Sequence, residues 1–252
     1  MTQRYFIEMA YDGTNYGGWQ IQPNSRTIQA VVEEALSTFY KTKVGVVGCG
    51  RTDAGVHASE YYFHVDLDPQ MYDDNLLKYK LNGITPKDIG FRKVHQLQSE
   101  AHARFDAISR SYEYNIHFEK DPFLVGLSYK YNQSVLPDID LLHQAAALIK
   151  GYEQFFPFCK SHTQVDNYKC TIMRSEWEVK PNGNLIYHVQ ANRFLRGMVR
   201  LLVGMCINVA VKKYPLSDVK TALINQNRLD HAWSVPAEGL FLSKIEYPYI
   251  SK

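Results

Sequence analysis

The alternation of apolar and polar residues at the start of the chain predicts a strand followed by a turn. Residues 4–11 alternate, are rich in strand-forming side chains and end at Asp12-Gly13. Further strands are predicted at residues 44–49, 61–65, 89–97 and 110–118, and near the C-terminus at 240–247. Residues 171–179 and 185–191 predict a hairpin, because the Asn-Gly pair in the turn between them is a strong hairpin signal.

Helical periodicity alternates with these strands. Apolar residues recur at helical spacing over residues 27–40 and form one stripe made of Ile28, Val31, Val32, Ala35, Leu36 and Phe39. Other helices are predicted at about 74–81, 138–150 and 216–224. A long helix is predicted from Arg193 to about Val211, capped by Asn192. In such a helix Arg193, Arg196 and Arg200 would share one face.

The order of these elements predicts a duplicated α+β unit. Both halves begin with a strand, continue with an amphipathic helix and return to strands, and no Pro, Gly and Ser-rich linker separates them. We expect two similar lobes, residues 1–107 and 108–252, that share a continuous, mainly antiparallel sheet with helices on one face. The central cleft between the lobes is the expected binding site.

Composition excludes several classes of protein. The 252 residues are 45% hydrophobic and 21% charged, which is typical of a globular chain. The longest apolar run, residues 201–211, is interrupted by Gly204 and Asn208 and is shorter than the roughly 18 residues needed to cross a bilayer. The first residues lack the apolar core of a signal peptide, so a cytoplasmic protein is expected.

Metal and nucleotide motifs are absent from the sequence. The four cysteines form no C-x-x-C pair, the nine histidines show no zinc spacing, and there is no Walker A motif. We therefore expect buried thiols and a chemistry that uses neither metal nor nucleotide cofactor.

Charge is unevenly distributed although the net charge is only +2. Residues 179–217 contain no Asp or Glu but contain six basic residues: Lys180, Arg193, Arg196, Arg200, Lys212 and Lys213. One surface should be locally basic. The 18 tyrosines could stack on unpaired bases, although most are better explained as strand formers.

Two residues stand out as candidates for chemistry. Asp53 lies among Gly48, Gly50 and Gly55, where it could be an exposed carboxylate or simply a turn former that bonds its own backbone. Arg200 is the only charge within residues 198–207, and a buried guanidinium needs a partner. For Arg193 and Arg196, phosphate contact and a solvated basic edge are the alternatives.

Five motifs together resemble the TruA family of tRNA pseudouridine synthases. They follow one another in family order: YDGT with GWQ at 11–14 and 18–20, GRTDAGVH at 50–57, RSYEY at 110–114, ANRFL through MVR at 191–200, and PAEGL at 236–240. The resemblance spans nearly the whole chain, and the GRTDAGVH run is its most specific part.

The resemblance implies a cofactor-free isomerisation of uridine to pseudouridine at positions 38, 39 and 40 of the tRNA anticodon stem-loop. Asp53 would be the catalytic carboxylate acting at the ribose, by attack at C1′ or by another first step, and Arg200 would pair with it. Tyr112 would stack on the uracil, with its hydroxyl near the C5 proton, while Leu240 packs the other side and Arg51 holds the flipped-out nucleotide. A homodimer that grips one tRNA is also implied.

Some positions depart from the family pattern, and other functions stay open. The unusual positions are Glu153, Gln154, Cys170 and the segment with His231, Trp233 and Ser234. They concern RNA fit and target position more than the reaction. A non-catalytic tRNA-binding protein of the same fold is the alternative function. A nucleoside hydrolase would need a second well-placed carboxylate, for which the sequence offers no convincing candidate.

Overall fold

The computed structural model describes residues 2–69, 73–98, 100–160 and 167–250. The chain forms two compact units. Unit 1 comprises Met1–Ile108 with Phe241–Lys252, and unit 2 comprises Ser109–Leu240. The predicted domains, 1–107 and 108–252, stay a prediction, because compactness does not show which parts fold on their own.

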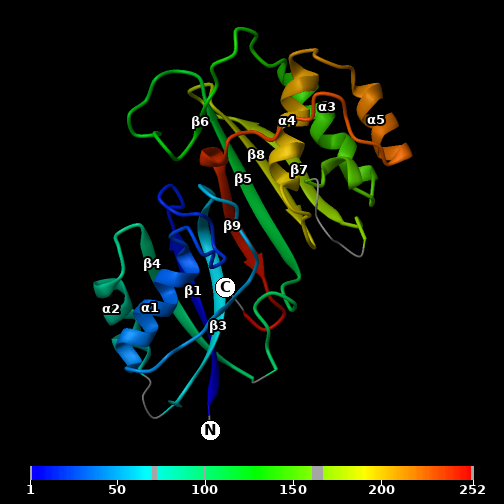
Figure 1. Cartoon of the computed structure of the whole chain (residues 1–252). Helices are drawn as coiled ribbons and strands as arrows, with labels where there is room; N and C mark the ends of the chain where they lie inside the picture. The colour runs from blue at the N-terminus through cyan, green and yellow to red at the C-terminus, as the bar shows by residue number, and fades with distance from the viewer. Residues whose placement is uncertain (1, 70–72, 99, 161–166, 251–252) are drawn as a thin grey trace. The chain divides into compact units, whose positions relative to one another are not determined.

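Unit 1 contains a sheet in the order β4-β1-β3-β9, with the short β2 paired to β3 (Figure 1). Its antiparallel centre is β1 between β3 and β4, whereas β3 and β9 run parallel. The elements are β1 (Gln3–Tyr11), α1 (Ile28–Tyr40), β2 (Val47–Gly48), β3 (His57–Leu67), α2 (Asp74–Ile84), β4 (Ile89–Leu97) and β9 (Leu240–Glu246).

The first helix confirms most of the predicted stripe, although Val31 and Phe39 are only half-buried. Thr27 caps α1 by accepting the Ala30 N–H at its Oγ1 (3.4 Å), and Lys41 ends the helix in the left-handed conformation. The buried side chains are Ile28, Val32, Ala35, Leu36 and Tyr40. The second helix extends to Ile84, three residues beyond the expectation. Both helices place an apolar face inside unit 1 because helical spacing puts those residues on one side.

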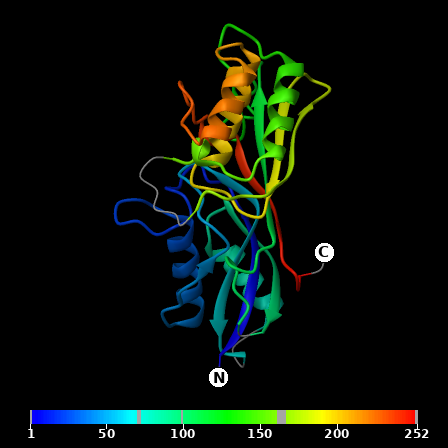
Figure 2. The same cartoon turned by 90° about the vertical axis from the view of Figure 1, so that its right-hand side faces the viewer.

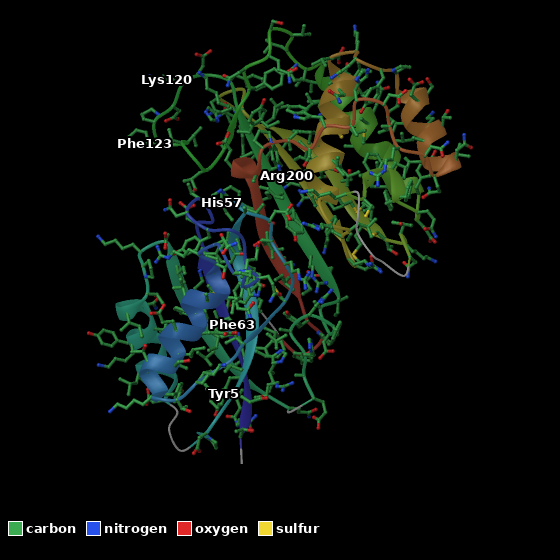
Figure 3. The ribbon with its side chains drawn as sticks, viewed as in Figure 1. Tyr5, His57, Phe63, Lys120, Phe123 and Arg200 are labelled. Carbon is green, nitrogen blue, oxygen red and sulfur yellow. The ribbon has the colours of Figure 1, made fainter. Side chains whose placement is uncertain are left out.

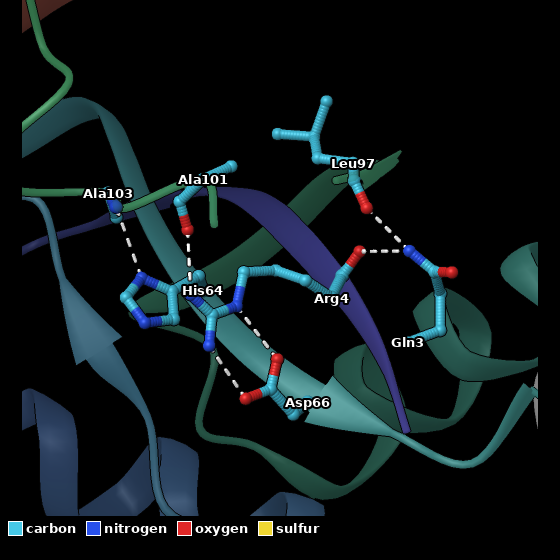
Figure 4. Close-up of polar contacts among 7 residues, drawn as sticks. All are labelled: Gln3, Arg4, His64, Asp66, Leu97, Ala101 and Ala103. Carbon is cyan, nitrogen blue, oxygen red and sulfur yellow. Dashed lines mark hydrogen bonds and ion pairs between the residues drawn. The ribbon is translucent and has the colours of Figure 1, made fainter. Parts of the chain in front are cut away.

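At one end of the unit 1 sheet, polar contacts link three segments of the chain: β1, β3 and residues 101–103 (Figure 4). Arg4 donates from Nε and Nη2 to the two carboxylate oxygens of Asp66, at 2.8 and 2.7 Å, and from Nη1 to Ala101 O at 2.8 Å. The buried His64 accepts the Ala103 N–H at Nδ1, at 3.1 Å. Because an acceptor nitrogen carries no proton, His64 must be neutral in the folded protein.

We expect this neutral His64 to make stability fall as pH drops from about 6.5 to about 4. Burial, with the nearby charges of Arg4 and His102, lowers the pKa of His64 to about 4, whereas Asp66 and Asp106 oppose the shift. Between these pH values the unfolded chain binds the proton more strongly than the folded chain, so stability present above pH 6.5 is lost toward pH 4.

The loss should be about 1–2 kcal/mol after allowing for solvent screening. Urea melts between pH 4 and 7.5 would measure it. The His64→Asn variant keeps an acceptor for Ala103 and should show a flatter profile. An identical profile in both proteins would contradict the assignment.

Unit 2 contains the sheet β5-β8-β7, which is antiparallel throughout, with the short β6 parallel to β5. Its helix α3 lies beside β7 and α4 (Figure 2). In unit 1, α2 lies beside β4 and α1 (Figure 1). The elements are β5 (Ser109–His117), β6 (Tyr129–Lys130), α3 (Ile139–Leu148), η2 (Ile149–Gly151), η3 (Phe156–Phe158), β7 (Ile172–Val179), β8 (Leu185–Ala191), α4 (Met198–Ala210), α5 (Leu216–Asn225) and η4 (Ala237–Gly239).

The predicted hairpin is confirmed, but the predicted start of the long helix is wrong. Lys180 and Asn184 close the hairpin through a backbone bond of 2.8 Å, with Gly183 at φ +81°. The following helix begins at Met198, because Gly197 takes the left-handed conformation and breaks the helical path. Asn192 instead accepts the N–H groups of Thr171 and Arg193 at its Oδ1. Arg193 and Arg196 therefore do not share a helical face with Arg200.

Other differences from the predicted elements are small. The strand expected at 44–49 shortens to β2 (Val47–Gly48), and β6 and the 3₁₀ turns were not predicted. All four cysteines are free and buried, as expected. At the level of class, the mixed α+β architecture with mostly antiparallel pairing is confirmed.

Candidate active site

Asp53 lies in unit 1, in the loop that connects β2 to β3. Its side chain is half-buried, and its backbone oxygen accepts the Val56 N–H at 3.2 Å, with Gly55 at φ +74°. The carbonyl of Asp53 closes this turn. Because this bond is made by the main chain, it would remain in an Asp53→Asn variant.

The residue before Asp53 is held from two sides. Thr52 is buried; its Oγ1 lies 2.9 Å from the Tyr11 hydroxyl, and its backbone oxygen accepts the Trp19 N–H at 3.3 Å. The Tyr61 hydroxyl donates to Gly50 O at 2.5 Å. These bonds fix the backbone of the loop to β1, to β3 and to the segment around Trp19.

Two glycines let that segment approach the Asp53 loop at backbone contact. A Cβ on Gly18 would lie 2.2 Å from Thr52 O, and the residue has φ +91°; a Cβ on Gly13 would lie 2.0 Å from Val56 O. Only glycine fits at either position. The YDGT and GWQ motifs thus form the support of the catalytic candidate, a role that the sequence alone did not reveal.

His57 completes this support at the start of β3 (Figure 3). The ring is fully buried, stacks on Phe241 at 4.5 Å, and accepts the Gly13 N–H at Nδ1 (3.0 Å). Asp12 Oδ1 lies 3.0 Å from the same nitrogen. Partial burial acts to raise the pKa of Asp12, but hydrogen bonds from Thr14 lower it overall, so this carboxylate is ionised at neutral pH.

Tyr112 lies in unit 2, on β5. It is half-buried, pairs with Val189 of β8 in the antiparallel register, and meets the ring of Phe194 edge-to-face at 5.1 Å. Phe194 belongs to the ANRFL motif. The contact therefore brings two of the sequence motifs together and fixes one edge of the tyrosine ring.

Arg200 lies in the first turn of α4 in unit 2 (Figure 3). Its half-buried guanidinium donates from Nε to Val235 O at 2.6 Å, and the Val235 N–H donates back to Arg200 O at 3.3 Å. The sequence predicted that the guanidinium has a partner, and the Val235 carbonyl of the same unit is one such partner. The predicted pairing with Asp53 stays a prediction.

Leu240 follows the 3₁₀ turn η4 and is buried. The turn packs tightly on β5, because a Cβ on Gly239 would lie 2.7 Å from Asn115 O and 2.9 Å from the Tyr114 ring. The glycine of the PAEGL motif therefore sets how closely the backbone before Leu240 can approach the strand that carries Tyr112.

The remaining basic candidates occupy the loop before α4 and the loop after β2. Arg193 is half-buried, with Nη1 3.5 Å from Asn167 Oδ1, and Arg196 is exposed. Arg51 is exposed beside Asp53. Exposure is compatible both with phosphate contact and with a solvated basic edge, so both interpretations of Arg193 and Arg196 remain.

The positions that depart from the family pattern have structural contacts in unit 2. Glu153 forms an ion pair with Lys169 at 2.9 Å, and its backbone oxygen accepts the Cys170 N–H at 2.9 Å. Burial raises the pKa of the Cys170 thiol to about 11. Trp233 meets Tyr129 edge-to-face at 6.1 Å. These residues contribute to the packing around α4 and β7.

The predicted site residues thus fall in both units. Asp53 and Arg51 belong to unit 1, whereas Tyr112, Arg193, Arg196, Arg200 and Leu240 belong to unit 2. Within the described ranges, no group of three or more His, Cys, Asp or Glu side chains could hold a metal ion. The helices of the same ranges include none long and apolar enough to span a membrane.

Comparison with known proteins agrees with the motifs. A family model described as tRNA pseudouridine synthase matches residues 145–248, which include Arg200 and Leu240. The chain is 41% identical over 247 residues to tRNA pseudouridine synthase A of Porphyromonas gingivalis, with 97% of each chain covered. It is 42% identical to the Bacteroides fragilis protein of that name, covering 98% of this chain and 97% of the relative, and 35% identical to the Staphylococcus aureus (strain MRSA252) protein, covering 96% and 91%. The identity extends over nearly the full length of every chain, so the protein belongs to the tRNA pseudouridine synthase A family of isomerases.

Proposed function

We propose that this protein converts uridine to pseudouridine in tRNA, at positions 38, 39 and 40 of the anticodon stem-loop. The observation that carries the proposal is the full-length similarity to tRNA pseudouridine synthases A, combined with a half-buried Asp53 on a loop that backbone contacts hold in place. The protein would act in the cytoplasm, on tRNA, without metal or cofactor.

Asp53 is the carboxylate that acts at the ribose. The reaction breaks the bond between N1 and C1′ and forms a bond between C5 and C1′; C5 loses its proton and N1 gains one. No water is consumed, so the paired carboxylates of most glycosidases are not needed. One aspartate carboxylate, held by a rigid loop and paired with Arg200, supplies the charge that the reaction requires.

Tyr112 and Leu240 hold the uracil. The ring of Tyr112, fixed at one edge by Phe194, stacks on the base, and Leu240 packs against the opposite face. A base inside a stem must first leave the stack, and Arg51 helps to hold the flipped-out nucleotide. Arg193 and Arg196 add positive charge for the RNA backbone.

Tyr112→Phe should retain tRNA affinity and lose most of the turnover. Phenylalanine keeps the stacking face and the contact with Phe194, but it removes the hydroxyl placed for transfer of the C5 proton. We expect kcat to fall about a hundredfold, within the usual range for a lost acid–base group. Single-turnover kinetics and filter binding would measure the two quantities. Equal losses of affinity and rate would assign Tyr112 to the scaffold instead.

The proposal includes the fold and assembly that the family resemblance implies. In that fold the two units share one continuous sheet, with helices on one face, and the reaction takes place in the cleft between them. A homodimer grips one tRNA with basic surface from both chains. Apolar side chains in unit 2 support an assembly: Phe123, Val125 and Leu136 are 87%, 77% and 68% exposed, and Figure 3 shows Phe123 on a loop of unit 2.

We therefore expect a dimer of about twice the 29.1 kDa chain mass. Sedimentation velocity at micromolar protein would measure the mass, and activity measured at the same concentrations would relate it to function. A monomer that is fully active at these concentrations would contradict the dimer. Phe123→Ser, which alters an exposed side chain, should weaken the dimer without lowering the melting temperature of the monomer.

Pseudouridine mapping tests the proposed function by position. Unmodified tRNA transcripts with uridine at 38, 39 or 40 would be incubated with the protein, treated with a carbodiimide that marks pseudouridine, and copied by reverse transcriptase. Stops at those positions are expected. Tight binding without stops would favour the alternative, a tRNA-binding protein that retains the fold.

A further inference from the structure

A segment of unit 2 without helix or strand, residues 231–236, lies along α4 and contacts it at regular intervals. The contacts pair helix residues four apart with segment residues two apart, running in opposite directions: Asn208 with His231, Gly204 with Trp233, and Arg200 with Val235. The helix residue at one end of this series is the predicted partner of the catalytic aspartate.

Each contact is specific to its residue type. The buried Asn208 donates from Nδ2 to His231 O at 3.2 Å. A Cβ on Gly204 would lie 1.8 Å from Trp233 O, so no other residue fits there. Arg200 and Val235 exchange two hydrogen bonds, of 2.6 and 3.3 Å.

The spacing of the contacts has a simple geometric basis. Four residues of α-helix rise about 6.0 Å, and two residues of extended chain rise about 6.6 Å. The two repeats therefore stay in step over two turns. His231 begins the segment in the left-handed conformation, φ 57°, which is unfavourable for a non-glycine residue, and the bond from Asn208 helps to hold it.

Tyr114 anchors the other end of the segment. Its side chain is fully buried, and its hydroxyl donates to Pro236 O at 2.8 Å, just before the turn that leads to Leu240. Burial raises the pKa of Tyr114, so the hydroxyl stays protonated and remains a donor. Tyr114 and Tyr112 are two residues apart on β5 and so lie on one face of the strand.

We propose that Tyr114 and Asn208 are positioning residues for the isomerisation. They fix the two ends of the 231–236 segment, which sets the orientation of the Arg200 guanidinium through Val235 and the approach of Leu240 through Pro236. Both side chains are buried, and they act through the segment instead of on the uracil. This inference rests on the proposed function for its kinetic part, whereas the anchoring itself does not depend on activity.

Tyr187 supplies a matched control for Tyr114. It lies directly opposite Tyr114 on β8, is equally buried, and places its hydroxyl 2.8 Å from Ser175 Oγ instead of against the segment. Tyr114→Phe and Tyr187→Phe each remove one buried hydroxyl from the same sheet. A merely structural role predicts similar effects of both variants on every measurement.

Two measurements on the full-length protein test the proposal. In wild type, Tyr114→Phe, Asn208→Leu and Tyr187→Phe, hydrogen exchange would follow the Val235 amide, and kinetics with a tRNA transcript would give kcat and KM. In Tyr114→Phe we expect exchange at Val235 to accelerate about tenfold or more and kcat to fall by a similar factor, because a small misplacement of site groups is costly. KM should stay within about twofold, because phosphate contacts elsewhere dominate RNA affinity.

Different experimental results would overturn the positioning role of Tyr114 and Asn208 and the proposed function. Exchange and kcat in Tyr114→Phe that match those of Tyr187→Phe would overturn the inference, even if Asn208→Leu does not fold. A wild-type protein that forms no pseudouridine would overturn the proposed function, and the exchange at Val235 would still show whether the two residues anchor the segment.

Discussion

Asp53→Asn should abolish pseudouridine formation while leaving the folded protein and its tRNA affinity nearly unchanged. The amide has the shape of the carboxylate, and the turn at this position is closed by the backbone oxygen of Asp53, which the substitution keeps. The contacts of Thr52 and Gly18 that hold the loop are also unaffected. The substitution removes the negative charge and reactivity of the carboxylate, together with its proposed attraction to Arg200.

We expect turnover below about one hundredth of the wild-type rate, as for the removal of a group that acts directly on the substrate. Pseudouridine formation, melting temperature and tRNA binding would be measured together. Glu34→Gln, an exposed change on α1, is the control for loss of a carboxylate in unit 1. If Asp53 were only a turn former, its variant would resemble the control, and turnover above about one hundredth would contradict the catalytic role.

Arg200→Lys should be almost inactive, even though it conserves the charge. The Nε–H of Arg200 is bonded to Val235 O, and this bond orients the planar guanidinium. Lysine has a single ammonium group, which cannot bond Val235 and also grip a carboxylate with a flat, two-pronged geometry. We expect a loss of about a hundredfold or more in kcat.

A double-mutant cycle tests the proposed pair directly. Arg200→Ala removes the bond to Val235 and any interaction with Asp53, and both losses lower stability. The loss of the Val235 bond is the same whether aspartate or asparagine occupies position 53, so it cancels in the cycle. A coupling free energy of about 1 kcal/mol or more between Arg200→Ala and Asp53→Asn is expected if the two side chains are partners. Strictly additive stability losses would mean that Asp53 has another partner.

The elements that the sequence predicted well are those whose signals are local. The stripe on α1 and the Asn-Gly turn between β7 and β8 are set by residues close together in the chain. The predicted start of α4 was wrong because asparagine is a residue type that often caps helices, and Asn192 was chosen for that reason. The residue that sets the start is Gly197, and its left-handed backbone conformation cannot be read from the sequence pattern. The two-residue strand β6 depends on its pairing with β5, which is a tertiary contact.

In the candidate site, too, the sequence predicted the features with local signals and missed those that depend on tertiary contacts. Asp53 and Arg200 were predicted as candidates from their local sequence, and Tyr112 and Leu240 were predicted through the family resemblance; all four stay predictions. The supporting roles of Gly13, Gly18 and Gly204 could not be found in that way. Each of them depends on a backbone oxygen that is distant in the chain, such as Thr52 O for Gly18 and Trp233 O for Gly204.

Tritium release tests the central claim most directly. Formation of the bond between C5 and C1′ requires the hydrogen at C5 to leave, so an unmodified tRNA carrying tritium at uracil C5 reports the isomerisation itself. The proposed function predicts release from tRNA with uridine at 38, 39 or 40, no release from a transcript with cytidine at those positions, and no release by Asp53→Asn. Tight tRNA binding by the wild-type protein without tritium release would contradict it.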